Sequence, residues 1–142
     1  MQWFVIDTNI IFASAINPNS KNLDMIFLLD DLDIKLYTPV KIYEEIQKHI
    51  AKIANKKKFS ANLLEDNIMT ILSYIKLINS DLYSNLISDN NKKLQNIDPN
   101  DVDFVSLAQK LWVPLWTNDK ALIEKVDWIE IVDTEHMIQK FL

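Results

Sequence analysis

Short apolar runs alternate along the chain with longer segments of helical periodicity, and this alternation constrains the fold more than any other feature. Strands are expected at residues 3–6, 34–38, 113–117 and 129–132. Helices are expected at residues 9–15, 20–30, 39–55, 60–78, 80–95, 98–112, 119–125 and 134–141. Strands separated by helices predict an α/β fold with a mostly parallel central sheet of four to five strands.

The length of the chain predicts one domain. A chain of 142 residues and 16.6 kDa suits a single unit spanning residues 1–142, with a helical pair at about 60–95. No apolar run approaches the roughly 20 residues that a membrane-spanning helix needs. The first residues, MQWFVID, lack the basic start and the cleavage site of a signal peptide. We therefore expect a cytoplasmic protein that does not enter a membrane.

Missing residue types exclude several kinds of chemistry. The chain has no Gly, which rules out P-loops, GxGxxG turns and G-x-S-x-G elbows, and no Cys, which rules out thiol nucleophiles and thiolate zinc sites. Its two His are too few for a histidine-rich metal site, and all of its basic residues are Lys. The net charge of −5 leaves nucleic-acid binding to a local lysine patch or to bound cations. Carboxylates are therefore the expected carriers of chemistry.

Two carboxylates directly follow expected strands. Asp7 follows the run WFVI, and Asp119 follows VPLWTN. Ligands of parallel sheets bind beyond the carboxyl ends of the strands, so these two side chains converge if their strands are neighbours. The alternative is that each Asp only caps the helix that follows it.

A helical wheel separates two adjacent acids in the helix that we expect to begin at Pro39. With Ile42 at zero, the apolar stripe centres near about 35°, Glu44 falls at about 200° and Glu45 at about −60°. Glu45 therefore lies at the edge of the buried face, where it can reach a cleft, whereas Glu44 faces solvent. His49 lies one turn beyond Glu45 and is close enough to pair with it, either as a half-buried helix residue or as a ligand.

A third acidic position lies in the helix expected after Pro99. With Phe104 at zero, Asp101 falls at about 60°, inside the apolar stripe, and Asp103 near −100°, at its edge. A carboxylate on an apolar face is unfavourable unless it is paired or bound to a metal. The alternative takes Asp98 as the N-cap and Asp101 as an acid in the first turn that favours the helix dipole.

Asp7, Glu45, Asp101 and Asp119 thus form a candidate acidic cluster assembled from four separate segments. Clustered carboxylates repel one another unless protons or cations neutralise them. Sites made only of oxygen ligands suit Mg²⁺ or Mn²⁺. Chemistry that uses these ions usually concerns phosphates.

Four segments together resemble the motifs of the PIN-domain nucleases. They are VIDTNII, PVKIYEEIQKHI, DVDFVSLA and LWTNDKAL, and they occur in the order and at the spacing of that family. The resemblance selects Glu45 over Glu44 in the second segment and maps the third and fourth acids onto Asp101 and Asp119. It spans most of the chain, although residues 60–95 match only as helical segments.

The resemblance implies a three-layer α/β/α fold and a metal-dependent endoribonuclease that hydrolyses RNA by metal-activated water. It implies 5′-phosphate and 3′-hydroxyl product ends. Asp7 and Asp101 would be direct ligands of Mg²⁺ or Mn²⁺, while Glu45 and Asp119 would bind the metal or orient water. Asn9 and Thr117 would either support this site or act as turn and capping residues.

Partners also follow from the resemblance. Family members are often toxins of toxin–antitoxin pairs and often dimerise, and others process RNA. An RNA substrate, an antitoxin or other protein partner, and a homodimer are therefore expected. The RNA path would have to use lysines, which otherwise form a solvated face: Lys41, Lys48, Lys52 and Lys56 to Lys58.

Three alternatives stand beside this interpretation. A phosphoacceptor receiver domain needs neighbouring acids after the first strand, and a haloacid-type phosphatase needs D-x-D there, whereas the chain has Asp7-Thr8-Asn9. Both are disfavoured. The remaining alternative is a catalytically degenerate PIN-fold module that binds a partner through the helices at 60–95.

Overall fold

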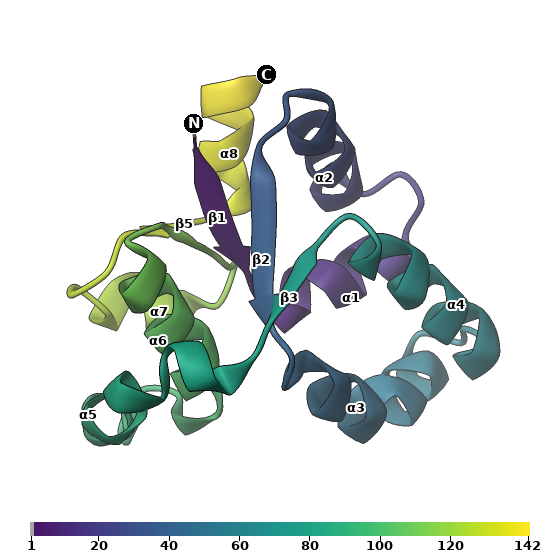
Figure 1. The fold of residues 1–142 in the computed structure, drawn as a ribbon. Coiled ribbons are helices and arrows are strands. Elements are labelled where there is room, and N and C mark those ends of the chain that lie inside the picture. Colours follow the sequence, from purple (N-terminus) through teal and green to yellow (C-terminus); the bar gives the residue numbers. More distant parts are fainter. Residues whose placement is uncertain (1) are drawn as a thin grey trace.

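A computed structural model, which describes residues 2–142, has a five-stranded parallel sheet with helices on both faces (Figure 1). The strand order is β3-β2-β1-β4-β5. This three-layer architecture confirms the predicted α/β fold. The strands are β1 (Trp3–Ile6), β2 (Lys35–Pro39), β3 (Lys76–Ile78), β4 (Leu115–Trp116) and β5 (Ile131–Val132).

The helices divide between the two faces of the sheet. In Figure 1, α1, α2 and α4 lie on one side, and α5 and α6 lie on the other. No helix within residues 2–142 combines the length and the apolar character that crossing a membrane requires. The helices are α1 (Thr8–Ile16), α2 (Lys21–Asp31), α3 (Ile42–Lys56), α4 (Ala61–Leu72), α5 (Ser84–Leu94), α6 (Val102–Leu111), α7 (Lys120–Lys125) and α8 (Thr134–Phe141), with short 3₁₀ turns at Ser80–Leu82 and Pro99–Asp101.

The core explains why the first strand is a continuous apolar run. Phe4, Val5 and Ile6 are all buried, because helices cover both faces of β1. Burying one such side chain contributes roughly 1.5–3 kcal/mol. The first strand is therefore a rigid base for the residue that follows it, Asp7.

The register of the sheet brings two distant segments together. The chain leads from β1 to β2 and β3 on one side of the sheet, and to β4 and β5 on the other side. Strands β1 and β4 pair in parallel with Ile6 opposite Trp116, so the strand order reverses between them. The next residues, Asp7 and Thr117, therefore lie side by side where ligands of such sheets bind.

One strand was missed by the sequence prediction. Residues 60–78 were expected to be helical, but α4 ends at Leu72, and Lys76–Ile78 form β3, which pairs in parallel with β2. Three residues are too few to show a periodicity of two against a helical background. Pro39 was also expected to start a helix; it ends β2, and α3 begins at Ile42.

The helix expected at 98–112 begins differently. Asp98 caps a 3₁₀ turn over Pro99–Asp101, and α6 begins at Val102. The first two turns of α6 are buried on all sides, so placing Asp103 at the edge of an apolar stripe was wrong. Asp103 is buried and accepts a hydrogen bond of 2.6 Å from the Tyr83 hydroxyl, and Lys41 Nζ lies 3.4 Å from its other oxygen.

Candidate metal and nuclease site

A cavity of about 470 Å³ opens at the carboxyl ends of β1 and β4. All four acids predicted from the sequence line it, together with one further acid, Asp98. The rest of the lining comes mainly from α1 and α3: Thr8, Asn9, Phe12, Ala13, Ile16, His49, Ile53, Lys56, Lys57 and Asn100. The fold therefore gathers side chains from four segments of the chain at one place.

Thr117 connects the carboxylates that follow β1 and β4. The buried Thr117 hydroxyl donates a hydrogen bond of 2.7 Å to Asp7 Oδ2, and it accepts one of 3.1 Å from the Asp119 backbone N–H. Asn9 Nδ2 lies 3.5 Å from the same hydroxyl. Thr117 therefore acts on the site through Asp7 and Asp119, and Asn9, which lines the cavity, makes only a long contact with this hydroxyl.

Capping fixes the two acids at the strand ends. Asp7 Oδ1 accepts a hydrogen bond of 2.7 Å from the Thr8 N–H, and Asp119 Oδ1 accepts bonds from the N–H groups of Ala121 and Leu122. Each carboxylate thus uses one oxygen as a helix cap. Neither capping bond uses Asp119 Oδ2, which can serve a ligand. Capping and ligand binding are compatible here rather than alternatives.

Three carboxylates form the tightest group in the cavity. Oxygen atoms of Asp98, Asp101 and Asp119 all lie within 4.8 Å of one another. Asp98 and Asp101 belong to the 3₁₀ turn before α6, and Asp119 belongs to the turn after β4. The sequence interpretation gave Asp98 only a capping role; it does accept a hydrogen bond from the Asn100 N–H, but it also belongs to this group.

Burial and mutual repulsion raise the pKa values of these acids. Burial raises the pKa of Asp7 to about 6, although hydrogen bonds from Thr117 and Thr8 oppose the shift. Burial, followed by the charge of Asp7 and contact with Asp98, raises the pKa of Asp101 to about 10. The pKa of Asp119 is raised as well, by burial and then by Asp98. The group therefore disfavours its own negative charge.

Glu45 and Glu44 face different surroundings, as the helical wheel predicted. The half-buried side chain of Glu45 lines the acidic cavity, and His49 Nε2 lies 3.5 Å from its Oε2. Glu44 is exposed and lines a separate hollow near Lys41 and Asp103. Glu45 does not belong to the group of three close acids; it lines the same cavity from α3.

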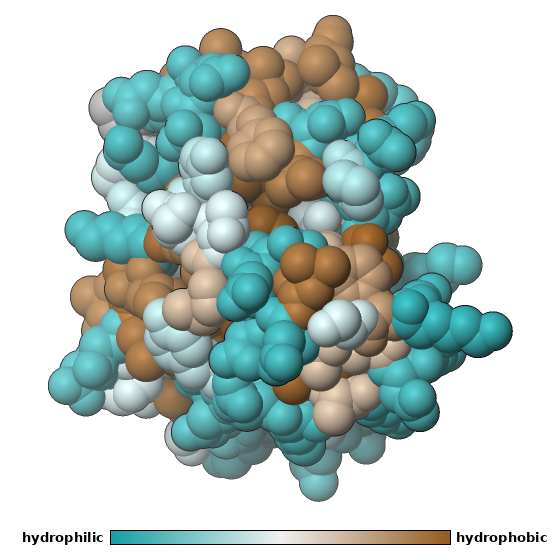
Figure 2. All heavy atoms as spheres, turned by 90° about the vertical axis from the view of Figure 1, so that its right-hand side faces the viewer, coloured by the Kyte–Doolittle hydropathy of each residue, from teal (hydrophilic) through white to brown (hydrophobic). Residues whose placement is uncertain are grey.

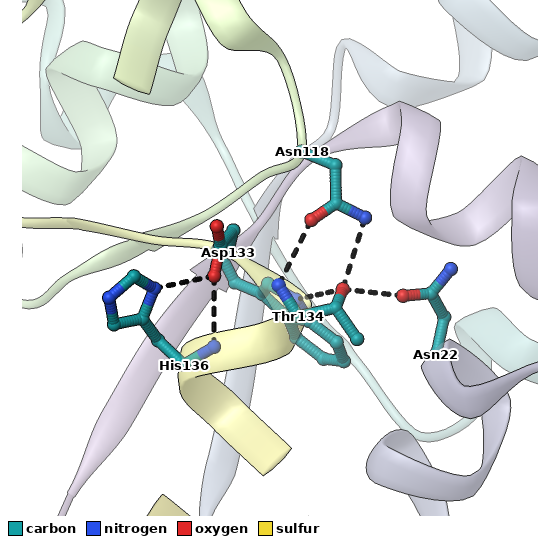
Figure 3. A network of polar contacts seen from close by, with 6 residues as sticks. Asn22, Asn118, Asp133, Thr134 and His136 are labelled. Atoms are coloured by element: carbon teal, nitrogen blue, oxygen red, sulfur yellow. Dashed lines mark hydrogen bonds and ion pairs between the residues drawn. The ribbon is translucent and has the colours of Figure 1, made fainter. Parts of the chain in front are cut away.

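A polar network holds the turn that carries Thr117 and Asp119 (Figure 3). Between them, Asn118 pairs twice with Thr134 at the start of α8: Nδ2 donates to Thr134 Oγ1 at 3.1 Å, and Oδ1 accepts from the Thr134 N–H at 2.9 Å. Trp116 Nε1 also donates to Thr134 Oγ1, and this hydroxyl donates to Asn22 of α2. No sequence signal identified this network, because its members lie far apart in the chain.

A larger hollow lies at the other end of the sheet. It has a volume of about 580 Å³ and is lined by Trp112, Trp128, Asp127 and Glu130, among others. Within residues 2–142, the only group of three acids close enough to hold a metal ion is the one in the cavity beside β1 and β4. The cavity beside β1 and β4 is therefore the candidate site because carboxylates gather there, not because of its size.

Comparison with known proteins assigns the family. The PIN domain family model matches residues 5–139, nearly the whole chain, and the protein therefore belongs to the PIN domain family, a family of nucleases. The resemblance identified from the four sequence motifs is confirmed. No curated protein matches the chain in sequence.

Solved structures share the fold. VapBC2 from Rickettsia felis bound to a promoter DNA fragment aligns with a TM-score of 0.71 at 19% identity, over 93% of this chain and 98% of that chain. DNA-bound VapBC from Salmonella typhimurium gives 0.70 at 17% identity, over 94% and 99%. FitAcB from Neisseria gonorrhoeae gives 0.67 at 18% identity, again over 94% and 99%. At such identities the likeness concerns the fold.

Proposed function

We propose that the protein is an endoribonuclease that depends on Mg²⁺ or Mn²⁺ and hydrolyses RNA phosphodiester bonds at the acidic cavity. The observation that carries this proposal is the group of Asp98, Asp101 and Asp119, with Asp7 beside it, in a chain of the PIN family. Burial, and after it the neighbouring carboxylates, raises the pKa values of Asp7, Asp101 and Asp119 and so disfavours their charged forms. A divalent cation would favour these charged forms.

The donor set fits a hard divalent ion. All the ligand atoms in the group are carboxylate oxygens, and the chain has no Cys that would favour a softer metal. The hydroxyl of Thr8, which lines the same cavity, is buried without a hydrogen-bond partner among residues 2–142. When bound, such an ion supplies Lewis-acid activation of water and neutralises negative charge on the phosphate.

Each acid has a proposed role that follows from its position. Asp7 and Asp101 would hold the ion directly, because burial raises the pKa values of these two acids and a cation would favour their charged forms. Asp119 has one oxygen free of capping and would share the ion or orient water. Glu45, on α3, would orient water or a second ligand, and Thr117 would fix the Asp7 carboxylate through its 2.7 Å hydrogen bond.

Cleavage of single-stranded RNA by the purified protein tests the proposal. We expect cleavage with Mn²⁺ or Mg²⁺, none with EDTA, and products with 5′-phosphate and 3′-hydroxyl ends. The Asp101→Asn variant should lose cleavage while remaining folded. Cleavage that persists in EDTA, or 2′,3′-cyclic phosphate ends, would contradict the proposal. Metal binding without cleavage would favour the alternative, a PIN-fold module that only binds.

We infer an antitoxin-like protein as partner, because the structural neighbours include VapBC toxin–antitoxin complexes. A groove of about 410 Å³ between α1, α2 and α4 suits such a partner, since its lining is mostly apolar. Phe27 and Leu63 on its rim are exposed, and Figure 2 shows apolar atoms interrupting the polar surface of this side of the molecule.

A short open reading frame next to the gene would encode this partner. We expect its product to co-purify with the protein and the Leu63→Lys variant to lose it. A product that does not bind, or that binds the variant equally well, would contradict the inference. The predicted homodimer can be checked on the same samples by light scattering with and without the partner.

A further inference from the structure

The acidic cavity carries opposite charges at its two ends. The four aspartates lie next to the carboxyl ends of β1 and β4, and Glu45 lies in the first turn of α3, whereas Lys56 and Lys57 line the cavity at the other end of α3. We propose that Lys56 and Lys57 bind the phosphate backbone of a single-stranded nucleic acid as it leaves the acidic cluster along α3. This inference rests on the proposed nuclease function and assigns a substrate path to the same site.

The geometry of α3 places the cavity residues in one row. Glu45, His49, Ile53 and Lys56 fall at about 0°, 40°, 80° and 20° on the helical wheel, so one face of the helix lines the cavity. The 11 positions from Glu45 to Lys56 span roughly 16 Å along the helix axis. This length exceeds a single phosphate and suits a strand that runs along the helix.

The floor between the two charged ends is apolar. Phe12 and Ile16 of α1 and Ile53 of α3 line the cavity there. Proteins that bind single strands without reading their sequence combine a positively charged track with apolar or aromatic surfaces for the bases. The cavity has this arrangement, with a carboxylate end for the scissile phosphate, an apolar floor for a base, and lysines for a neighbouring phosphate.

The lysines of the chain differ in what surrounds them. Lys41 contacts Asp103, Lys35 contacts Asp33, and Lys93 contacts Asp89. Neither Lys56 nor Lys57 forms an ion pair within residues 2–142. Lys48 and Lys52 are exposed but fall at about −60° and −20°, outside the cavity sector. The structure thus selects two lysines among those that the sequence left equivalent.

The helix dipole does not fully account for this pair. A cation in the last turn of α3 is favoured by the dipole, and Lys56 occupies that turn. The dipole sets no direction around the helix axis, however, and Lys57 lies beyond the last helical residue. A protein with a net charge of −5 repels a polyanion, so cations at the rim of this cavity have a specific use.

Fluorescence anisotropy with labelled oligouridylate tests the rim. The measurement uses the Asp101→Asn protein in EDTA, which prevents cleavage, and compares it with the same protein carrying Lys56→Ala and Lys57→Ala. We expect affinity to fall by about tenfold and the slope of log K against log salt to fall by about 1.4, which is about 0.7 for each phosphate contact. Circular dichroism checks that the variants are folded.

A charge-matched control separates a specific rim from a general charge effect. The Lys92→Ala, Lys110→Ala variant loses the same charge at exposed positions outside the cavity, and we expect its affinity to change less than twofold. Equal losses in the two variants would overturn the proposal. An oligoglutamate peptide that displaces labelled oligouridylate as well as unlabelled RNA does would also overturn the proposal, because Lys56 and Lys57 would then bind an acidic peptide.

Two further outcomes separate this inference from the proposed function. In one outcome, the wild type cleaves RNA with Mn²⁺ while the Lys56→Ala, Lys57→Ala variant keeps its affinity for RNA. In that case the two lysines do not bind the phosphate backbone, and the proposed nuclease function stands. If the wild type neither binds nor cleaves any RNA, both are wrong. Oligothymidylate that binds as tightly as oligouridylate would support a site that reads only phosphates.

Discussion

Glu44 and Glu45 are adjacent on α3 and chemically identical, yet only one of them meets the acidic cavity. Rotation by one residue directs Glu45 into the cavity beside His49 and leaves Glu44 exposed near Lys41. The pair therefore offers an internal comparison in which composition, local charge and helix propensity are held constant.

We expect Glu45→Gln to reduce RNA cleavage by at least about 100-fold, because it removes the charge that we propose orients water or metal while keeping the shape of the side chain. Glu44→Gln should leave cleavage nearly unchanged. Single-turnover cleavage rates with Mn²⁺ measure the difference. Equal losses in two folded variants, or a larger loss for Glu44→Gln, would mean that Glu45 has no special role.

Thr134 offers a second test at the scale of one residue. Thr134→Val removes the hydroxyl that accepts hydrogen bonds from Trp116 and Asn118, so the turn carrying Asp119 keeps only the bond from the Thr134 N–H to Asn118 Oδ1. We expect the free energy of unfolding to fall by about 1–2 kcal/mol. The affinity for Mn²⁺, measured by calorimetry, should fall about tenfold. Thr134→Ser should restore both.

A cap at the same helix start provides the control for Thr134. Asp133 Oδ1 accepts a hydrogen bond from the His136 N–H but does not contact Asn118. Asp133→Ala should therefore destabilise α8 by about 1 kcal/mol without changing the Mn²⁺ affinity of the folded protein. A matching loss of affinity in this variant would mean that the network affects the site only through stability.

Sequence reasoning identified an acid on an apolar helix face, where a carboxylate is unfavourable. It passed over an acid whose presence helix capping already explains. Asp101 stood out because a carboxylate on an apolar face needs a reason. Asp98 did not, because a cap before Pro explains it fully; only the fold shows that it also meets Asp119. Asp103 was misplaced because its partners, Tyr83 and Lys41, come from distant segments.

At the scale of the element, the chain has no glycine, so other residues occupy the left-handed position at three helix ends. The residues that follow α2, α3 and α6 take the left-handed conformation that glycine usually provides: Asp33, Lys58 and Trp112, with φ of 57°, 54° and 58°. At each end the next N–H bonds back to the fifth residue before it, as between Val113 and the Ala108 carbonyl. The motif forms although its preferred residue is missing.

Trp112→Gly should therefore stabilise the protein. A non-glycine residue in this conformation costs roughly 1–2 kcal/mol, partly offset by the greater freedom of glycine in the unfolded chain. The Trp112 side chain is 94% exposed, so its loss removes little burial. We expect a net gain of about 0.5–1 kcal/mol in urea unfolding, whereas Lys110→Gly, inside α6, should cost about 1 kcal/mol. Destabilisation by Trp112→Gly would show that the indole contributes contacts.

The elements that sequence reasoning located best are those whose pattern is long or complete. The stripe of α3 and the buried run of β1 were predicted within a few residues, because each repeats one signal several times. Strand β3 was missed, since its three residues gain their hydrogen bonds from β2 rather than from any local preference. Pro39 ends β2 where a helix start was expected, because the pairing of Pro39 with Ile78 extends the strand.

At the scale of the whole molecule, the acidic site opposes folding. Asp7 and Asp101 bind a proton more tightly in the folded protein, where their pKa values rise to about 6 and about 10, than in the unfolded chain, where they lie near 3.8. The stability of the metal-free protein therefore falls as pH rises from about 4 through these folded values. A protein of this kind sacrifices stability for a site that a cation can use.

The melting temperature of the metal-free protein should fall as Asp7 and Asp101 become charged. In EDTA we expect it to be several degrees higher at about pH 5 than at about pH 8. Millimolar Mn²⁺ should raise it at about pH 8 and have much less effect at about pH 5, because protons then compete with the metal for the carboxylates. Differential scanning calorimetry across pH, with and without Mn²⁺, measures both effects.

Neutralising one acid should raise the melting temperature as low pH does, and it should remove the rise that Mn²⁺ causes. Asp101→Asn keeps the side-chain shape without the charge, so it should raise the melting temperature in EDTA at about pH 8 and abolish the rise with Mn²⁺. Asp89→Asn, at an exposed position on α5, should change neither. A lower melting temperature for Asp101→Asn in EDTA would show that the Asp101 carboxylate stabilises the fold. In that case the repulsion between the acids would not be what a cation relieves.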